Sequence, residues 1–176
     1  MKTNVDDGLT AGHDAMEAAF LEAMPWLKTV DAYKPLQGGQ AVTSPAVLIE
    51  AVEMQPGRKA SNGKTPVEVE FAAHCILSVT TSRVELAIRN FAALVIQFVD
   101  GNRWGLGDEV ERPTELSAYP GMFKPDEKGF ESWVVNWKQV FHLGEPETLP
   151  DYLPTDVFIG EYPNVGPGHE DDYDKG

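Results

Sequence analysis

The C-terminal stretch His169-Glu-Asp-Asp-Tyr-Asp174 has the residue types of a metal or catalytic site, because it holds one imidazole and four carboxylates. Carboxylate oxygens are the ligands that Ca²⁺ and Mg²⁺ prefer in proteins. Three of the acids are consecutive, however, whereas a calcium-binding EF loop places its ligands at alternate positions. The stretch also lies outside every periodic element, so no rigid scaffold would hold a catalytic geometry. We therefore interpret it as a solvated acidic tail or a protein contact, and not as a site of chemistry.

The remaining candidates for catalysis or metal binding are two histidines and one cysteine. His74 and His142 fall on the polar faces of two predicted strands, where they could sit side by side, but two ligands are too few for a zinc site. Cys75 falls on the apolar face of its strand, which favours a core thiol over a nucleophile. The segment Asn62-Gly-Lys-Thr65 shares letters with a phosphate-binding loop, but a strand follows it instead of the required helix. These patterns predict no catalytic residue, no metal and no cofactor, and hence a structural protein and not an enzyme.

Hydrophobic periodicity predicts two helices and four strands. In chain order they are a helix that begins near Ala11, strands Val47–Met54 and Val67–Val79, a helix after Ser82, and strands Glu109–Leu116 and Glu131–Leu143. Ser82 and Glu85 match a capping box at the start of the second helix. Strands that run in neighbouring pairs around a helix predict an α+β fold, with a largely antiparallel sheet, helices packed on one face and the order α-β-β-α-β-β. We divide the chain into a flexible N-terminus over 1–10, a single domain over 11–144 and a Pro-rich, acidic, extended C-terminal arm over 145–176.

The charge of the chain excludes some classes of partner. Its 176 residues include 14 basic and 28 acidic ones, which gives a net charge of −14. From Gln139 onward there are nine acids and one base, so −8 of this charge lies in the last stretch. Nucleic acids and anionic membranes attract clustered Lys and Arg, so we expect contact with neither. No run of 18 apolar residues predicts a membrane span, and a single cysteine excludes a disulfide scaffold within one subunit.

The segment Gln55–Pro66 is predicted to be a long loop between two strands. It contains two prolines and two glycines but almost no apolar side chain. Its cations Arg58, Lys59 and Lys64 form the densest positive charge in an acidic protein. Because loops on a rigid scaffold often carry function, we predict that these three residues contact a partner.

The C-terminal arm is the second predicted contact. Its apolar side chains are followed by acidic ones, and the residues that we expect at an interface are Phe158, Ile159, Tyr162, Val165, Glu170, Asp171 and Asp172. Val157–Ile159 could pair briefly as a strand, and the rest of the segment is expected to be an extended arm without a sheet partner in its own chain. An apolar, extended segment of this kind usually docks on another surface, and we expect a neighbouring subunit or another protein there.

Three stretches, WVVNWKQVFHLGE, VFIGEYPNVGPGHEDDYD and SRVELAIRNFAALV, resemble tail proteins of Mu-like bacteriophages, and in particular the tail terminator or tail-completion proteins of long-tailed phages. The resemblance covers roughly residues 45–174. It implies a small α+β subunit that forms a homohexameric ring on the end of the tail tube, stops tube polymerisation and presents a surface for head–tail joining. The partners it implies are further copies of the chain, the tail tube protein and a neck or head-completion protein. The implied location is the virion tail, and the host cytoplasm during assembly.

Two other functions compete with this one. The chain could be a neck or head–tail adaptor protein without terminator activity, or a small metal-binding enzyme. The lack of a recognisable nucleophile–base pair in the sequence weighs against the enzyme. The number of subunits in solution, with and without the tail tube protein, would separate a terminator from an adaptor.

Overall fold

The computed structural model describes residues 8–34, 42–58, 63–121 and 129–145, together with the backbone of 158–159 and 174–175. The chain divides into two compact units, Met1–Pro146 and Glu147–Gly176. In the second unit, strand β6 (Phe158–Ile159) pairs antiparallel with strand β7 (Asp174–Lys175). The brief pairing expected at Val157–Ile159 is therefore confirmed, whereas the expectation that the arm lacks a sheet partner in its own chain is wrong.

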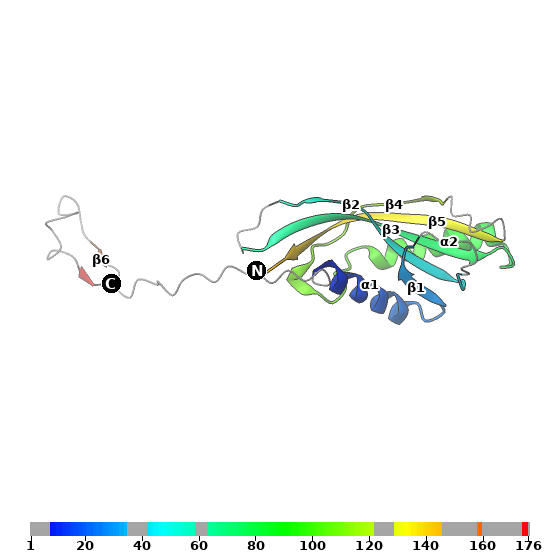
Figure 1. The fold of residues 1–176 in the computed structure, drawn as a ribbon, viewed down its shortest axis with the longest axis horizontal. Coiled ribbons are helices and arrows are strands. Elements are labelled where there is room, and N and C mark those ends of the chain that lie inside the picture. Colours follow the sequence, from blue (N-terminus) through cyan, green and yellow to red (C-terminus); the bar gives the residue numbers. More distant parts are fainter. Residues whose placement is uncertain are drawn as a thin grey trace. The chain divides into compact units, whose positions relative to one another are not determined.

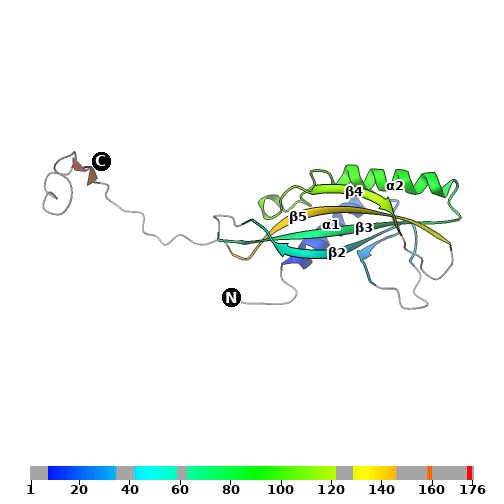
Figure 2. The same ribbon diagram turned by 90° about the horizontal axis from the view of Figure 1, so that it is seen from above.

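The first unit contains a five-stranded sheet with the strand order β1-β2-β3-β5-β4. Its elements are α1 (Leu9–Ala23), β1 (Thr29–Ala32), β2 (Ala46–Pro56), β3 (Thr65–Ser78), α2 (Val84–Val99), the 3-10 helix η1 (Gly107–Glu109), β4 (Thr114–Pro120) and β5 (Phe130–Leu143). Both α-helices lie on the same side of the sheet (Figure 1). Seen from above, β4, β5, β3 and β2 follow one another across it (Figure 2). These elements confirm the predicted α+β class. Among the described residues, no helix is long and apolar enough to cross a membrane.

The ladder between β3 and β5 organises the sheet. It runs through fourteen residue pairs, from Thr65 opposite Leu143 to Ser78 opposite Phe130, without a shift of register. Because side chains alternate across a strand, one register assigns every residue of both strands to a face. The side facing the helices carries the apolar set Val69, Phe71, Ala73, Cys75, Val135, Trp137 and Phe141.

The two helices cover this apolar face. From α1, Met16 and Phe20 enter the core, and from α2, Ile88 and Val95 do so. Buried Gly12 lets α1 approach β5 closely, because a Cβ there would lie 2.5 Å from the Phe141 ring. Burial of these side chains stabilises the fold by roughly 1.5–3 kcal/mol for each large one.

Gln139 is a polar residue inside this core, with 1% of its surface exposed. Its Oε1 accepts hydrogen bonds from the indole N–H groups of Trp104 (2.8 Å) and Trp137 (3.2 Å). Its Nε2 donates to the carbonyl oxygens of Asn102 (2.9 Å) and Glu111 (2.8 Å). All four bonding positions of the amide are thus occupied, and they join β5 to the segment that connects α2 with β4.

The structure corrects four details of the predicted elements. It adds β1, which pairs in parallel with β2, so the sheet is mixed and the order is α-β-β-β-α-β-β. The capping box is wrong, because Arg83 in the left-handed region (φ 51°) precedes α2 and no side chain caps that end. The strand predicted from residue 109 begins at Thr114, after Pro113, which cannot donate to a ladder. The loop between β2 and β3 is shorter than predicted, since both strands extend into the Gln55–Pro66 segment.

We predict that Gln139→Leu lowers the free energy of unfolding by about 3–5 kcal/mol, because it leaves two buried indole donors and two partly buried carbonyl acceptors without this partner. Urea unfolding at neutral pH measures the change. The control is Gln97→Leu, the same substitution on an exposed position of α2, which should change the stability by less than about 0.5 kcal/mol. Equal effects of the two substitutions would refute the role given to the buried amide.

Candidate functional site on the open face of the sheet

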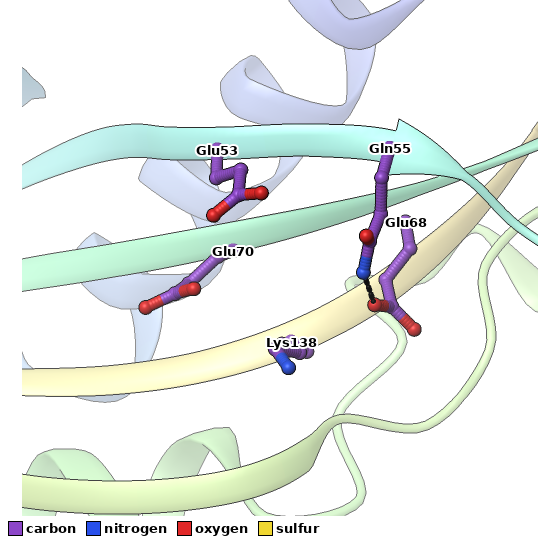
Figure 3. A pocket seen from close by; sticks show the side chains of 5 residues that line it. All are labelled: Glu53, Gln55, Glu68, Glu70 and Lys138. Atoms are coloured by element: carbon purple, nitrogen blue, oxygen red, sulfur yellow. Dashed lines mark hydrogen bonds between the residues drawn. The ribbon is translucent and has the colours of Figure 1, made fainter.

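The face of the sheet opposite the helices carries a cluster of charged side chains. Glu53 and Gln55 from β2, Glu68 and Glu70 from β3, and Lys138 from β5 line a surface pocket of about 160 Å³ (Figure 3). The register explains their proximity, because Glu53 lies opposite Glu70, Gln55 opposite Glu68, and Glu70 opposite Lys138. We refer to these five residues as the acidic face.

Hydrogen bonds extend from the acidic face towards β4. The Gln55 side-chain amide donates to Glu68 Oε1 at 2.5 Å. The Asn136 amide donates to Glu70 Oε1 at 3.3 Å, and the Tyr119 hydroxyl donates to Asn136 Oδ1 at 3.2 Å. These bonds link side chains of four strands, so the surface has defined positions for polar groups.

Lys138 is the single cation among these five residues. Its Nζ lies 2.8 Å from Glu115 Oε2. Glu115 occupies the left-handed region (φ 54°) where the register of β4 and β5 shifts, and a bulge of this kind re-aims a side chain. The hydrogen bond to Glu115, together with the charges of Glu115, Glu68 and Glu70, raises the pKa of Lys138, although desolvation opposes this.

The charges of this surface define what it can bind. The acidic face has three carboxylates and one ammonium group, and Lys138 interacts with Glu68 and Glu70 of this face and with Glu115 beside it. In the part of the chain that the structure describes, no three His, Cys, Asp or Glu side chains lie close enough together to hold a metal ion. The acidic face is therefore suited to recognising cationic side chains through charge and hydrogen bonding.

The histidines do not meet. His74 Nε2 lies 2.8 Å from Glu50 Oε2, and the His74 ring stacks on Tyr33 with 4.6 Å between centroids. His142 Nε2 lies 3.1 Å from Glu111 Oε1. His142 is eight positions along β5 from Val134, the residue opposite His74, which corresponds to roughly 26 Å. The idea that the two histidines sit side by side as ligands is wrong, and each pairs with a carboxylate.

The structure confirms Cys75 as a core residue. The side chain is buried on the helix-facing side of β3, and burial raises the pKa of its thiol. A thiol in that state is a weak nucleophile.

Two of the three cations predicted to project from the β2–β3 loop, Arg58 and Lys64, lie within the described residues. Arg58 is exposed directly after β2. Lys64 forms an ion pair with Glu109 of η1, and only 13% of its side chain is exposed. Lys59 lies outside the described residues. Lys64 thus joins the loop to η1, which leaves Arg58 as the exposed cation among the two that the structure describes.

Of the residues expected at a contact of the arm, Phe158 and Ile159 form β6. The others, Tyr162, Val165, Glu170, Asp171 and Asp172, lie outside the described residues. The acidic face itself was not predicted from the sequence. The sequence pattern that could have indicated it is the polar side of β3, where Glu68 and Glu70 are two positions apart. The residues of β2 and β5 that complete the acidic face could not be predicted, because their positions depend on the register of strands distant in sequence.

Lys138→Gln should destabilise the protein at neutral pH and low salt, because it leaves several carboxylates without their shared cation. The raised pKa of Lys138 means that the ammonium favours the folded state. This stabilisation is fully present below the ordinary lysine value of 10.5 and is lost as the pH rises through the raised pKa. By urea unfolding at a pH of about 7, the free energy of unfolding should be higher for the wild type than for Lys138→Gln. The difference should be smaller at about 1 M salt, because salt screens the charges. In strong alkali the two free energies should nearly coincide.

Lys28→Gln is the matched control for Lys138→Gln, since Lys28 is an exposed lysine outside this surface. It should have little effect at any pH. A difference between the wild type and Lys138→Gln that does not depend on pH or salt would contradict the electrostatic explanation.

Lys64→Ser is predicted to lower the free energy of unfolding by about 0.5–1 kcal/mol, because Lys64 is mostly buried in its ion pair with the half-exposed Glu109. Arg58→Ser, which removes an exposed cation six positions earlier, should change it by less than about 0.5 kcal/mol. Thermal or urea unfolding of both variants makes the comparison. If Arg58→Ser proves the more damaging, the assignment of Lys64 as the structural cation fails.

Comparisons with known proteins add no further assignment. A scan of the sequence against protein-family models found no match, and a search of the curated proteins found none either. The function is therefore argued from the residues and their geometry.

Proposed function

We propose that the protein is a tail terminator of a long-tailed bacteriophage. In this role it is a structural protein that forms a homohexameric ring, caps the tail tube, stops polymerisation of the tube and presents a surface for head–tail joining. Its partners would be further copies of the chain, the tail tube protein and a neck or head-completion protein. It would act in the host cytoplasm during assembly and remain in the virion tail.

The observation that carries the proposal is the one-sided packing of the sheet. Both helices cover the apolar face, whereas the acidic face has exposed or half-buried carboxylates and hydrogen bonds between side chains of neighbouring strands. Such a surface suits reversible docking of a charged protein partner, in which complementary charge sets orientation and the rate of association. The resemblance of residues 45–174 to tail terminators names the kind of partner.

The division of the chain into two units supports the same role. Met1–Pro146 contains the hydrophobic core, and Glu147–Gly176 is a unit of its own. In the proposed role, this C-terminal unit contacts a neighbouring subunit or a neck protein. Division into two units also agrees with the second candidate, a head–tail adaptor without terminator activity, because an adaptor contacts two partners.

Deletion of the gene from the phage separates these two functions. For a terminator, we expect tails of abnormal and variable length, because nothing stops the growth of the tube. For an adaptor, we expect tails of normal length that do not join heads. Electron microscopy of negatively stained lysates measures both outcomes, and expression of the intact protein from a plasmid should restore normal particles. Infectious particles with normal tails after deletion would refute both functions.

A further inference from the structure

The second half of β2 is an exposed strand edge. Strand β1 pairs with β2 only over Ala46–Ile49, and the Tyr33 N–H donates to the Ile49 carbonyl at 2.8 Å where this pairing ends. From Ala51 to Pro56 every residue of β2 is exposed, and β3 is the one strand that pairs with this part among the described residues. We call Ala51–Pro56 the distal edge.

The distal edge has backbone groups that point away from the sheet. The Gly57 N–H donates to the Pro66 carbonyl at 2.9 Å, so Gly57 is directed towards β3. In an antiparallel ladder this direction alternates from one residue to the next. The N–H and carbonyl of Met54 therefore point outward, as does the carbonyl of Pro56. An outward edge of this kind can bind an extended chain as an additional strand.

The opposite edge of the sheet is protected against such addition. Strand β4 follows Pro113, ends at Pro120 and contains the irregularity at Glu115, and prolines and bulges are the features with which edge strands avoid pairing. The distal edge also carries an irregularity, between Ala51 and Glu53, and a proline, Pro56, but between them it stays in register with β3 and keeps the outward N–H of Met54.

The side chains around the distal edge define the chemistry of the added strand. On the helix-facing side, an added strand would meet Met54, which is 54% exposed although its cross-strand neighbour Val69 is buried. On the other side it would meet Glu53 and Gln55, which line the acidic face together with Glu68 and Glu70 (Figure 3). Because neighbouring strands match side chains face by face, the added strand needs apolar residues on one side and Lys or Arg on the other.

A second copy of this chain does not fit that description. Pairing of two distal edges would bring Glu53 of both copies to the same face, where like charges repel. None of the 14 Lys and Arg residues is followed by another two positions later, so no segment of the sequence places cations at two successive positions on one side of a strand. The charge pattern therefore favours an occupant from another protein.

We propose that the distal edge of β2 binds an extended segment of a different protein, in which Lys or Arg alternates with apolar residues. The backbone groups of Met54 provide the pairing, and Glu53 with the rest of the acidic face selects the cations. The inference does not depend on the proposed function, because it rests on the strand edge and its charges alone.

Binding of synthetic peptides to the full chain tests the proposal. The probe is an eight-residue peptide in which lysine and valine alternate. The first control peptide has the same composition, with its lysines in one block and its valines in another. The second control peptide alternates glutamate and valine. Fluorescence anisotropy measures affinity, and hydrogen exchange measures protection of the Met54 amide. We expect the alternating lysine peptide to bind at least several-fold more tightly than either control and to slow exchange at Met54.

Two variants separate pairing from charge. Met54→Pro removes the outward N–H without changing the charge and should abolish the preference for the alternating peptide. Glu53→Gln should weaken its binding by about two- to fivefold, as expected for one exposed ion pair, whereas Glu22→Gln on the exposed end of α1 should not. If Met54→Pro fails to fold, two other results still test the proposal. They are the difference in peptide affinity between Glu53→Gln and Glu22→Gln, and the protection of the Met54 amide in the wild type.

Equal affinity for the alternating and block peptides would overturn the proposal, since general attraction to an acidic protein would then explain the binding. Unchanged exchange at Met54 would overturn it as well. Protection of Met54 that rises with protein concentration in the absence of peptide would show that a second copy occupies the edge, and would also refute it.

Discussion

The register of β3 against β5 is the constraint on which the rest of the structure depends. Fourteen consecutive pairs fix which side chains face the helices and which form the acidic face. A shift by one residue would exchange the two sets and would place Glu68 and Glu70 in the core. The apolar burial that stabilises the domain and the charged surface that could bind a partner are thus two consequences of one pairing.

Gln139 reinforces this register from inside the core. Its amide binds two tryptophan side chains and two backbone carbonyls, so β5 and the segment between α2 and β4 are held in one relative position. A fully bonded buried amide tolerates few alternatives, because every shifted arrangement leaves polar groups without partners. The same segment carries Glu109, which pairs with Lys64 and so holds the start of β3 against η1. Hydrophobic packing supplies the driving force, and these polar contacts select a single arrangement.

The two faces of the sheet differ in the interactions that their side chains make. The helix-facing side needs shape-matched apolar groups, whereas the acidic face places several carboxylates near one lysine and so carries uncompensated charge. Charge of this kind contributes to solubility and to attraction of cationic partners, but it opposes tight self-association. This conflict is relevant to an assembly role, because copies of an acidic subunit can associate only through surfaces that avoid such clusters or with a partner that neutralises them.

The sequence by itself determined the α+β class, the buried and polar sides of the long strands and the core position of Cys75, because these follow from local alternation and helical periodicity. Alternation also places Gln139 on the apolar side of β5, between Trp137 and Phe141. Only the tertiary structure decided which partners that amide binds, that Lys64 pairs with Glu109, and that His74 and His142 lie far apart. It also revealed β1, the acidic face and the distal edge. All of these depend on the pairing of strands that are distant in sequence and on bulges within them, and no local pattern encodes a register between distant segments.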